Sequence, residues 1–408
     1  MNVLTELKEG LLISWAAIAA NKLRSILTTL GIVIGILTVT LMGTAIEGLN
    51  RAFLQSVSAM GADVLFVNRF GWFIHSYAEW IKAVKRPAIT LAQAAELERQ
   101  LTLSEAVAPT AQIWQRIQYK KRRSNNVTIT GSTEQFLMTA SVSMAAGRFM
   151  SPAEAQGGRP VCVIGYQVAT NLFQRQSAPG NKILIGDRGF EVVGVLEKQG
   201  SFLDSSIDNQ AIVPLPQFVS SFWSSPDYEI QVKVRHLEQL EDAKEEIRVV
   251  MRKIRRLAPH EPDDFAINQQ DQIVAMFHRV AGTIAGIGLF VTGLALFVGG
   301  IGIMNIMFVS VTERTREIGV RKAIGAKRRT ILVQFLIESA TICLLGGLIG
   351  LGLAWPLTFV LRKFIPATLS PIVVSIAIFV SLITGVLSGF FPAWRAARMN
   401  PVDALRNE

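Results

Sequence analysis

The chain of 408 residues has few of the side chains that build metal and redox centres, with only two cysteines and four histidines. Cys162 lies in a polar stretch and Cys343 in an apolar run, so we expect no disulfide, and no CxxC pair indicates a zinc or redox motif. His260 and Glu261 are followed by Pro262, which excludes a helical HExxH zinc site. The P-loop pattern and the GxSxG elbow of serine hydrolases are also absent, so we expect no enzyme activity and no nucleotide site on this chain.

Charged residues are also scarce. They make up 18% of the chain, against about 25% in soluble proteins, while hydrophobic residues make up 50% and the mean hydropathy is +0.36. This balance predicts a membrane protein with a soluble part. The first apolar run is too long and starts too late for a cleavable signal peptide. In a membrane protein the net charge of +10 is typical of basic cytoplasmic loops, so we expect no nucleic-acid partner.

Long runs without charge predict four membrane spans, since a span needs about 20 apolar residues. The runs cover residues 25–46, 280–312, 339–361 and 364–394, and the helix of the third run is expected to begin near Ile331. As a helix, the second run would be about 50 Å long, which exceeds a hydrocarbon core of about 30 Å. We therefore expect this helix to tilt or to project from the membrane as a stalk.

Lys and Arg residues gather in three regions beside the spans: before the first, between the second and third, and after the fourth. This predicts that these regions face the cytoplasm of a bacterial inner membrane and that both termini are cytoplasmic. The residues are Lys8, Lys22, Arg24, Arg314, Arg316, Arg321, Lys322, Lys327, Arg328, Arg329, Arg395, Arg398 and Arg406. The nearly neutral stretch 47–279 is then expected on the outer side. Short β-branched runs and helical patterns in this stretch predict a mixed α/β domain.

The expected fold is therefore an α-helical membrane protein with a large α/β domain inserted between its first two membrane helices. A strand-rich subdomain is expected at about 105–215. Residues 1–24 are expected to form an amphipathic helix, which either lies in the membrane interface with Trp15 as an anchor or packs against the spans. The expected segments are 1–24, 25–47 (span one), 48–278 (outer domain), 279–312 (span two), 313–330 (cytoplasmic loop), 331–361 (span three), 362–371 (outer loop), 372–394 (span four) and 395–408 (tail).

Two polar residues stand inside the expected spans. Glu338 lies about two turns into the third span, where an ionisable group is costly and is either paired or functional. A proton relay would need further acidic residues in the spans, and none is visible in the sequence. We therefore favour a hydrogen bond to a neighbouring helix, with Asn305 of the second span as a candidate partner.

Small residues recur at intervals of four in three of the spans, a spacing that lets two helix backbones approach closely. This pattern predicts tight helix packing, either within one chain or across a dimer. The glycines that carry it are Gly31, Gly35, Gly282, Gly286, Gly346 and Gly350.

The short basic loop after the second span mixes charged and apolar residues. Positive-inside charge alone would not require this mixture, whereas an amphipathic helix that docks into a groove of a soluble partner would. The candidate docking residues are Glu313, Arg314, Arg316, Glu317, Ile318, Gly319, Arg321, Lys322, Ile324 and Gly325.

Three segments, 20–35, 313–338 and 392–406, resemble the permeases of the MacB-type, FtsX-like class of ABC exporters. The resemblance implies a homodimer, or a dimer with a close paralogue, in which the 313–326 loop docks on an ABC ATPase. Since only about 24 residues precede the first span, the ATPase is expected on a separate chain, in two copies, which would bind ATP and Mg²⁺ while this chain binds no cofactor.

The resemblance further implies that ATP-driven motion reaches the periplasmic domain and drives export of a drug, peptide, lipid or lipoprotein. A periplasmic adaptor, an outer-membrane channel and the membrane lipids are the other expected partners. The alternative is an FtsX-like signalling protein that regulates a cell-wall hydrolase.

Overall fold

The computed structural model describes residues 22–58, 61–74, 76–174, 176–199, 201–202, 205–206 and 208–406. The expected amphipathic helix at 1–24 lies almost wholly outside these residues. The chain divides into two compact units. We call residues 1–52 and 278–408 the helical unit, and Phe53–Phe277 the α/β unit. Each is described by itself.

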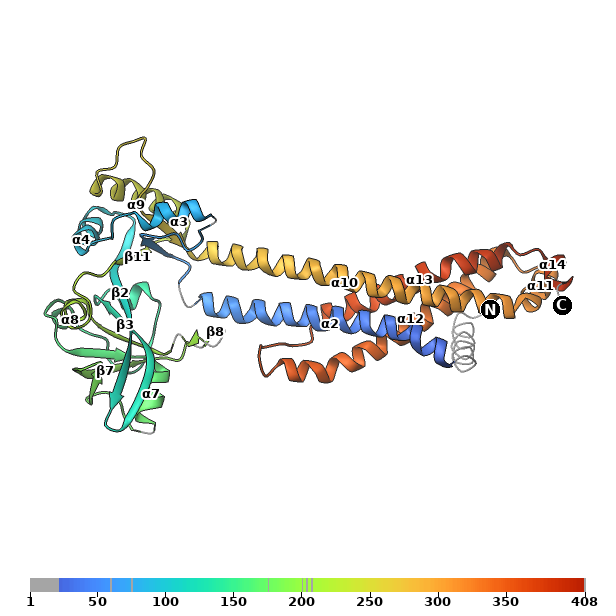
Figure 1. Ribbon diagram of the computed structural model, residues 1–408, viewed down its shortest axis with the longest axis horizontal. Helices are drawn as coiled ribbons and strands as arrows, with labels where there is room; N and C mark the ends of the chain where they lie inside the picture. Colours follow the sequence, from blue (N-terminus) through green and yellow to red (C-terminus); the bar gives the residue numbers. More distant parts are fainter. Residues whose placement is uncertain are drawn as a thin grey trace. The chain divides into compact units, whose positions relative to one another are not determined.

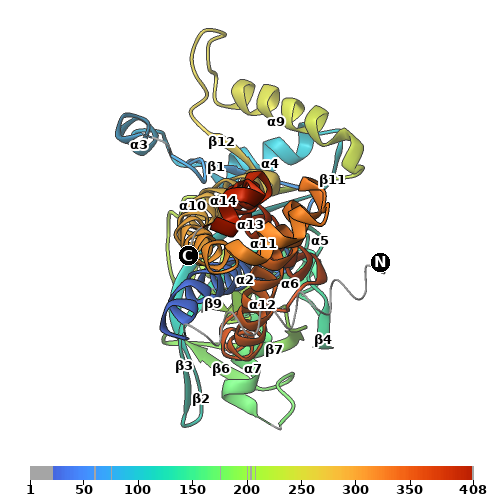
Figure 2. The ribbon, with the colours of Figure 1, turned by 90° about the vertical axis from the view of Figure 1, so that its right-hand side faces the viewer.

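The helical unit is built from long apolar helices and two short ones, drawn in Figure 1 and seen end-on in Figure 2. Within the described residues, four segments are long and apolar enough to cross a membrane: Thr29–Leu54, Gln270–Glu313, Arg328–Leu361 and Pro371–Arg398. The helices, some of which continue into the α/β unit, are α2 (Lys22–Ser58), α10 (Gln270–Glu313), α11 (Thr315–Ala323), α12 (Arg328–Leu361), α13 (Pro371–Arg398) and α14 (Pro401–Arg406).

The helix α10 is longer than a membrane crossing requires. Its 44 residues correspond to about 66 Å at 1.5 Å per residue. It begins at Gln270, about ten residues before the charge-free run from which the sequence predicted it. Residues 270–279 are helical, but they include polar and charged side chains, so a search for apolar runs does not detect them.

Close backbone contact at small residues packs the four long helices together. A Cβ atom built on Gly31 of α2 would lie 2.9 Å from the Cα of Gly299 in α10, so only glycine fits this crossing. Cβ atoms on Gly346 and Gly350 of α12 would lie 3.2 Å from Ile32 Cγ2 and 3.0 Å from the Val33 carbonyl oxygen of α2. In lipid, no hydrophobic effect drives apolar helices together, so these close van der Waals contacts supply the attraction between them.

The predicted packing glycines thus fall into two groups. Gly31, Gly346, Gly350 and also Gly35, whose Cβ would lie 2.7 Å from Leu296 Cδ2, sit at crossings within this chain. At Gly282 and Gly286 no atom of the described chain lies within 4 Å of a built Cβ. These two glycines therefore pack against nothing within the described part of one chain.

The first half of the α/β unit contains a four-stranded antiparallel sheet in the order β12–β1–β11–β2. Helices α4 and α9 pack together beside it, and apolar side chains such as Leu65, Leu97 and Ile247 form a shared core. The elements of this half are β1 (Val64–Asn68), α3 (Tyr77–Val84), α4 (Leu91–Gln100), β2 (Ser104–Tyr119), β11 (Glu229–Val234), η1 (Leu237–Gln239), α9 (Leu240–Ile254) and β12 (Ala266–Gln269).

The second half of the α/β unit is a closed barrel. Its strands pair in the ring β2–β3–β10–β5–β7–β6, and β6 pairs again with β2 through Ile117 opposite Ile185. Further elements lie around the ring. The elements are β3 (Arg122–Ser132), α5 (Phe136–Thr139), β4 (Met144–Gly147), α6 (Pro152–Gln156), β5 (Val161–Ile164), α7 (Tyr166–Phe173), β6 (Lys182–Ile185), β7 (Arg188–Leu196), β8 (Ser201–Phe202), β9 (Ser205–Ser206), β10 (Gln210–Pro214) and α8 (Leu215–Ser221).

The strand β2 belongs to both halves. Residues 104–110 pair with β11 in the sheet, and residues 111–119 pair with β3 in the barrel. Four long apolar helices with a mixed α/β domain between the first and the second confirm the expected fold class. The closed barrel is a feature that the sequence did not predict, because its closure depends on the pairing of strands more than 60 residues apart.

An ion pair between an exposed arginine and a buried glutamate fixes the start of α6. The Arg148 guanidinium donates two hydrogen bonds to the Glu154 carboxylate, of 2.6 and 2.7 Å. The Ser151 backbone N–H and hydroxyl group donate to the same carboxylate, and Ser151 caps the helix. These donors, Arg148 first, lower the pKa of Glu154 to about 2.

Replacement of this carboxylate by an amide, Glu154→Gln, is expected to lower the free energy of unfolding by about 1.5–3 kcal/mol at neutral pH, because hydrogen bonds to a charged group are lost. Since the pKa is lower in the folded state, this stabilisation is present above the ordinary Glu pKa and is lost as the pH falls toward 2. Thermal unfolding of the detergent-solubilised chain between pH 7 and pH 2 would measure it. A difference between wild type and variant that stays constant to pH 2 would contradict the assignment.

Candidate coupling site at one end of the helical unit

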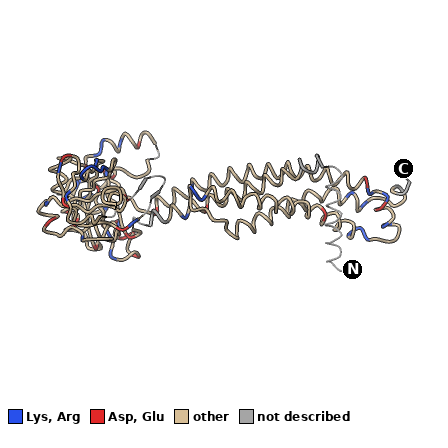
Figure 3. Tube along the Cα trace, turned by 90° about the horizontal axis from the view of Figure 1, so that it is seen from below, with Lys and Arg blue, Asp and Glu red and all other residues tan. Residues whose placement is uncertain are grey.

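The predicted docking loop forms α11 and the turns on either side of it. In the end-on view of Figure 2, α11 and α14 lie close together at the end of the helical unit, and the two helices contact each other. Figure 3 shows blue and red residues gathered at this end, beside a long uncharged stretch of the helices. The polar end therefore marks where the apolar, membrane-type surface stops.

A glycine ends α11 in a fixed geometry. Gly325 has a φ of +101°, which favours glycine. The Ala326 N–H donates to the Arg321 carbonyl and the Gly325 N–H donates to the Lys322 carbonyl, both at 3.0 Å. This pair of bonds is the Schellman motif of helix C-termini. The motif sets the direction in which the chain turns from α11 into α12.

One side of α11 is buried against the long helices. Ile318 is 2% exposed and Gly319 is also buried. Ile318 belongs to the same apolar cluster as Ile331 and Phe335 of α12 and Ala397 of α13. The helix is therefore packed onto the bundle along this side.

A lysine joins α11 to the end of α13. The Lys322 ammonium donates to the carbonyl oxygens of Ala397 and Met399, at 2.7 and 2.6 Å. These carbonyls lie at the C-terminus of α13, where backbone acceptors lack partners within the helix. Burial, followed by the nearby charge of Arg328, lowers the pKa of Lys322.

An arginine joins α11 to α12. Arg321 donates to the Gln334 side-chain oxygen at 2.8 Å and pairs with Glu317 one turn earlier in α11. Gln334 was not among the predicted site residues. The sequence could have indicated it, because Gln334 is a polar residue one turn before Glu338, the one acidic residue of the same apolar helix.

The acidic residue Glu338 pairs with Arg314, the residue between α10 and α11. Arg314 Nη1 lies 3.4 Å from both carboxylate oxygens, and Glu338 is only 3% exposed. Asn305, the partner that the sequence suggested, is exposed on α10 and makes no side-chain hydrogen bond within the described residues. The structure thus replaces the expected amide partner by an arginine.

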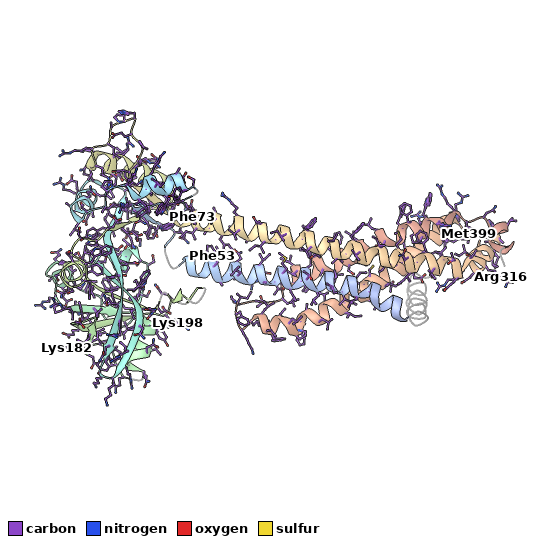
Figure 4. All side chains as sticks on the ribbon, viewed as in Figure 1. Phe53, Phe73, Lys182, Lys198, Arg316 and Met399 are labelled. Carbon is purple, nitrogen blue, oxygen red and sulfur yellow. The ribbon has the colours of Figure 1, made fainter. Side chains whose placement is uncertain are left out.

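The opposite side of α11 is free. Arg316 and Val320 are exposed, and Ile324, 81% exposed, follows the helix. Figure 4 labels Arg316 at this end of the helical unit, together with Met399. Of the predicted docking residues, Glu313, Arg316, Glu317, Ile324 and Gly325 are exposed, whereas Arg314, Ile318, Gly319, Arg321 and Lys322 contact the rest of the bundle or are partly buried against it.

This free side combines charged side chains of both signs with apolar groups. Val320 of α11 and Val402 of the neighbouring helix α14, 42% and 67% exposed, were not among the predicted site residues. A helix with one side fixed by packing and hydrogen bonds, and the other side exposed with charged and apolar side chains, is suited to bind a protein groove. We therefore assign the exposed side of α11 as the candidate docking surface.

Two family models match the chain. The model of the MacB-like periplasmic core domain matches residues 25–250, and the model of the FtsX-like permease C-terminal region matches residues 289–401. The second match contains α11 and the residues to which it is bonded.

Three relatives are similar over nearly the whole chain. It is 30% identical to the uncharacterized ABC transporter permease YknZ of Bacillus subtilis, over 98% of this chain and 100% of that protein. It is 32% identical to the macrolide export ATP-binding/permease protein MacB of Escherichia coli and to the pyoverdine export ATP-binding/permease protein PvdT of Pseudomonas syringae. The matches cover 98% and 99% of this chain but only 61% and 60% of those two proteins.

These matches define the chain as an ABC transporter permease. It belongs to the family of MacB-like, FtsX-type permeases, which confirms the resemblance found in the sequence. It is accordingly a multi-pass membrane protein with a periplasmic domain, which is the α/β unit. The full-length match to a permease also confirms the expectation that this chain is not itself an enzyme.

The ion pair between Glu338 and Arg314 gives a test of how α11 is held. Glu338→Leu leaves the Arg314 guanidinium without its carboxylate, at a cost of about 1–3 kcal/mol. Hydrogen–deuterium exchange should then show about tenfold faster exchange of the α11 amides, as local opening becomes easier. The matched control is Glu313→Leu, which removes an exposed carboxylate at the same end. Equal exchange in the two variants would contradict a role of the pair in holding α11.

Proposed function

We propose that this chain transmits ATP-driven motion from a separate ATPase to its periplasmic domain and thereby drives export of a substrate. The observation that carries the proposal is the division of α11 into a fixed and a free side. Lys322, Arg321 and Ile318 bind the bundle, while Arg316 and Ile324 are open to a partner. A force applied at the free side would therefore reach α12 and α13 directly.

The partner is proposed to be an ABC ATPase on another chain, present in two copies. MacB and PvdT are named as combined ATP-binding and permease proteins, and the chain matches about 60% of their length. The printed sequence contains no P-loop pattern. ATP and Mg²⁺ would therefore bind to the ATPase. The basic end with α11 would face the cytoplasm of a bacterial inner membrane, as would both termini.

The route of transmission follows from the continuity of the chain. The sheet strand β12 ends at Gln269, and α10 begins at the next residue and runs without interruption to Glu313, two residues before α11. A helix resists stretching, because its backbone hydrogen bonds run along its axis. A displacement of α11 would thus be passed along one helix to the strand β12 at the edge of the sheet.

The substrate is proposed to be engaged on the periplasmic side. The relatives are named for macrolide and pyoverdine export, and the candidate classes for this chain are a drug, a peptide, a lipid or a lipoprotein. A periplasmic adaptor and an outer-membrane channel would complete the path. Co-purification of a cell-wall hydrolase in place of an adaptor would favour the signalling alternative.

The double variant Arg316→Glu, Ile324→Asp tests the docking surface. Both side chains are exposed, so the variant is expected to fold as wild type while it releases the ATPase. Arg321 and Lys322 are unsuitable for this test, because they bind Gln334 and the end of α13 within the chain.

Purification in mild detergent with quantitative mass spectrometry would measure the ratio of ATPase to permease, with loss of most of the ATPase expected from a central charge reversal. Val249→Asp is the matched control, because this residue is apolar and 65% exposed but lies in α9 of the periplasmic domain. Retention of the ATPase by the double variant would exclude α11 as the docking element.

We also propose that a second permease copy packs on the open face of α10. Gly282, Gly286 and Gly293 have no atom of the described chain within 4 Å of a built Cβ, and Phe290 and Phe297 are 74% and 66% exposed. An apolar helix surface with small residues allows close approach of another helix.

Cysteine cross-linking tests this dimer. Gly286→Cys should give an oxidised dimer in native membranes, because the thiols of two copies would come within bonding distance. Gly352→Cys is the control, since this α12 glycine is equally open but lies on another helix. The native Cys162 and Cys343 are buried and should not react. A cross-link to a different permease would indicate a paralogue, and equal cross-linking at both positions would contradict the proposed face.

A further inference from the structure

Two arginines of α13 have no acidic partner among the residues that the structure describes. Arg395 and Arg398 lie in the last turn of the helix and are exposed. The Arg398 guanidinium lies 4.2 Å from the centre of the Trp394 ring, and the Arg395 guanidinium lies 5.9 Å from the centre of the Phe308 ring of α10. Within the described part of the chain, neither forms an ion pair or donates a side-chain hydrogen bond.

Several arginines near the helix ends do have partners, whereas Arg316, Arg328 and Arg329 are exposed and, within the described residues, as unpaired as Arg395 and Arg398 but without a ring contact. Arg314 pairs with Glu338, Arg321 with Glu317, and Arg51 with Glu47. At the opposite end of the helical unit, Arg362 donates to the Ala367 carbonyl at 3.0 Å. Arg395 and Arg398 are thus two positive charges, one turn apart, whose hydrogen-bond donors are held over aromatic rings and are unused.

The surface beside these arginines is apolar. Leu387, Phe391 and Trp394 of α13 are 70%, 63% and 42% exposed. Exposed aliphatic and aromatic groups in a membrane helix face acyl chains, and tryptophan is enriched where acyl chains meet headgroups. The unused guanidinium groups therefore stand at the level of the lipid headgroups.

We propose that Arg395 and Arg398 bind the phosphate of an anionic phospholipid at this end of α13. The guanidinium groups would donate charge-assisted hydrogen bonds to the phosphate oxygens. The Trp394 ring contacts the Arg398 guanidinium and the Phe308 ring contacts the Arg395 guanidinium, and both would hold these groups in place. The acyl chains would lie along Leu387 and Phe391. Basic sites between membrane helices are suited to this class of lipid.

The site also bears on the coupling helix. Lys322 of α11 binds the carbonyls of Ala397 and Met399, on either side of Arg398. A bound phosphate would order the turn to which α11 is fastened. The lipid site itself depends neither on the proposed ATPase nor on the proposed orientation, so its test is independent of both.

Fluorescence quenching by brominated lipids tests the proposal in the full-length chain. The chain would be reconstituted in vesicles that contain brominated phosphatidylglycerol or brominated phosphatidylcholine with the same acyl chains. Since the chain has seven tryptophans, the Trp394 signal is taken as the difference between wild type and Trp394→Phe.

Quenching at Trp394 should show a preference for phosphatidylglycerol of up to about thirtyfold, from two arginines near the membrane surface. In the double variant Arg395→Gln, Arg398→Gln, the two brominated lipids should quench Trp394 equally. The Trp394 signal of this variant is again taken as the difference from the same variant that also carries Trp394→Phe. The control Arg362→Gln, Lys363→Gln removes the same charge at the other end and should keep the preference.

Three results would overturn the proposal. Equal quenching by both lipids in wild type would exclude a headgroup site. A preference that persists in Arg395→Gln, Arg398→Gln would place the lipid elsewhere. Loss of the preference in the control would assign it to net charge. If the arginine variant instead loses the ATPase while wild type shows no lipid preference, these arginines belong to the protein interface.

Discussion

The hydrogen bonds from Lys322 to the end of α13 are the constraint on which the orientation of α11 depends. A short helix of nine residues has little stability of its own, so α11 needs external bonds to keep one orientation. Lys322, Arg321 and the Arg314–Glu338 pair supply these bonds from three directions. They use the polar groups at one side of α11 and so leave its other side free for a partner.

Small residues serve the same bundle in a second way. Where glycine meets glycine, as at Gly31 and Gly299, the helices lie so close that neither can rotate without a clash. Where glycine meets no neighbour in the described part of the chain, as at Gly282 and Gly286, the helix keeps a smooth, open surface. The same residue type therefore fixes one part of α10 and leaves another part open.

Much of the organisation could be predicted from the sequence, because apolar runs, charge and local motifs are local signals. The four spans, the inserted α/β domain and the basic loop are of this kind. The partners of Lys322 could not be predicted, since its acceptors lie 75 and 77 residues away. Asn305 was the expected hydrogen-bond partner of Glu338, but the long side chain of Arg314 reaches this carboxylate from the turn after α10. The glycine spacing indicated close packing but not which glycines face a neighbour in the same chain.

The shared strand β2 restricts how the periplasmic domain can move. Its 16 residues, about 53 Å when extended, are bonded to the sheet along one part and to the barrel along the other. The two ladders meet at Thr110 and Ala111, so a movement of the barrel against the sheet has to bend the backbone of β2 at this junction. Sheet and barrel are therefore continuous through one strand, so in the proposed function a displacement that enters the sheet would pass into the barrel along the backbone of β2.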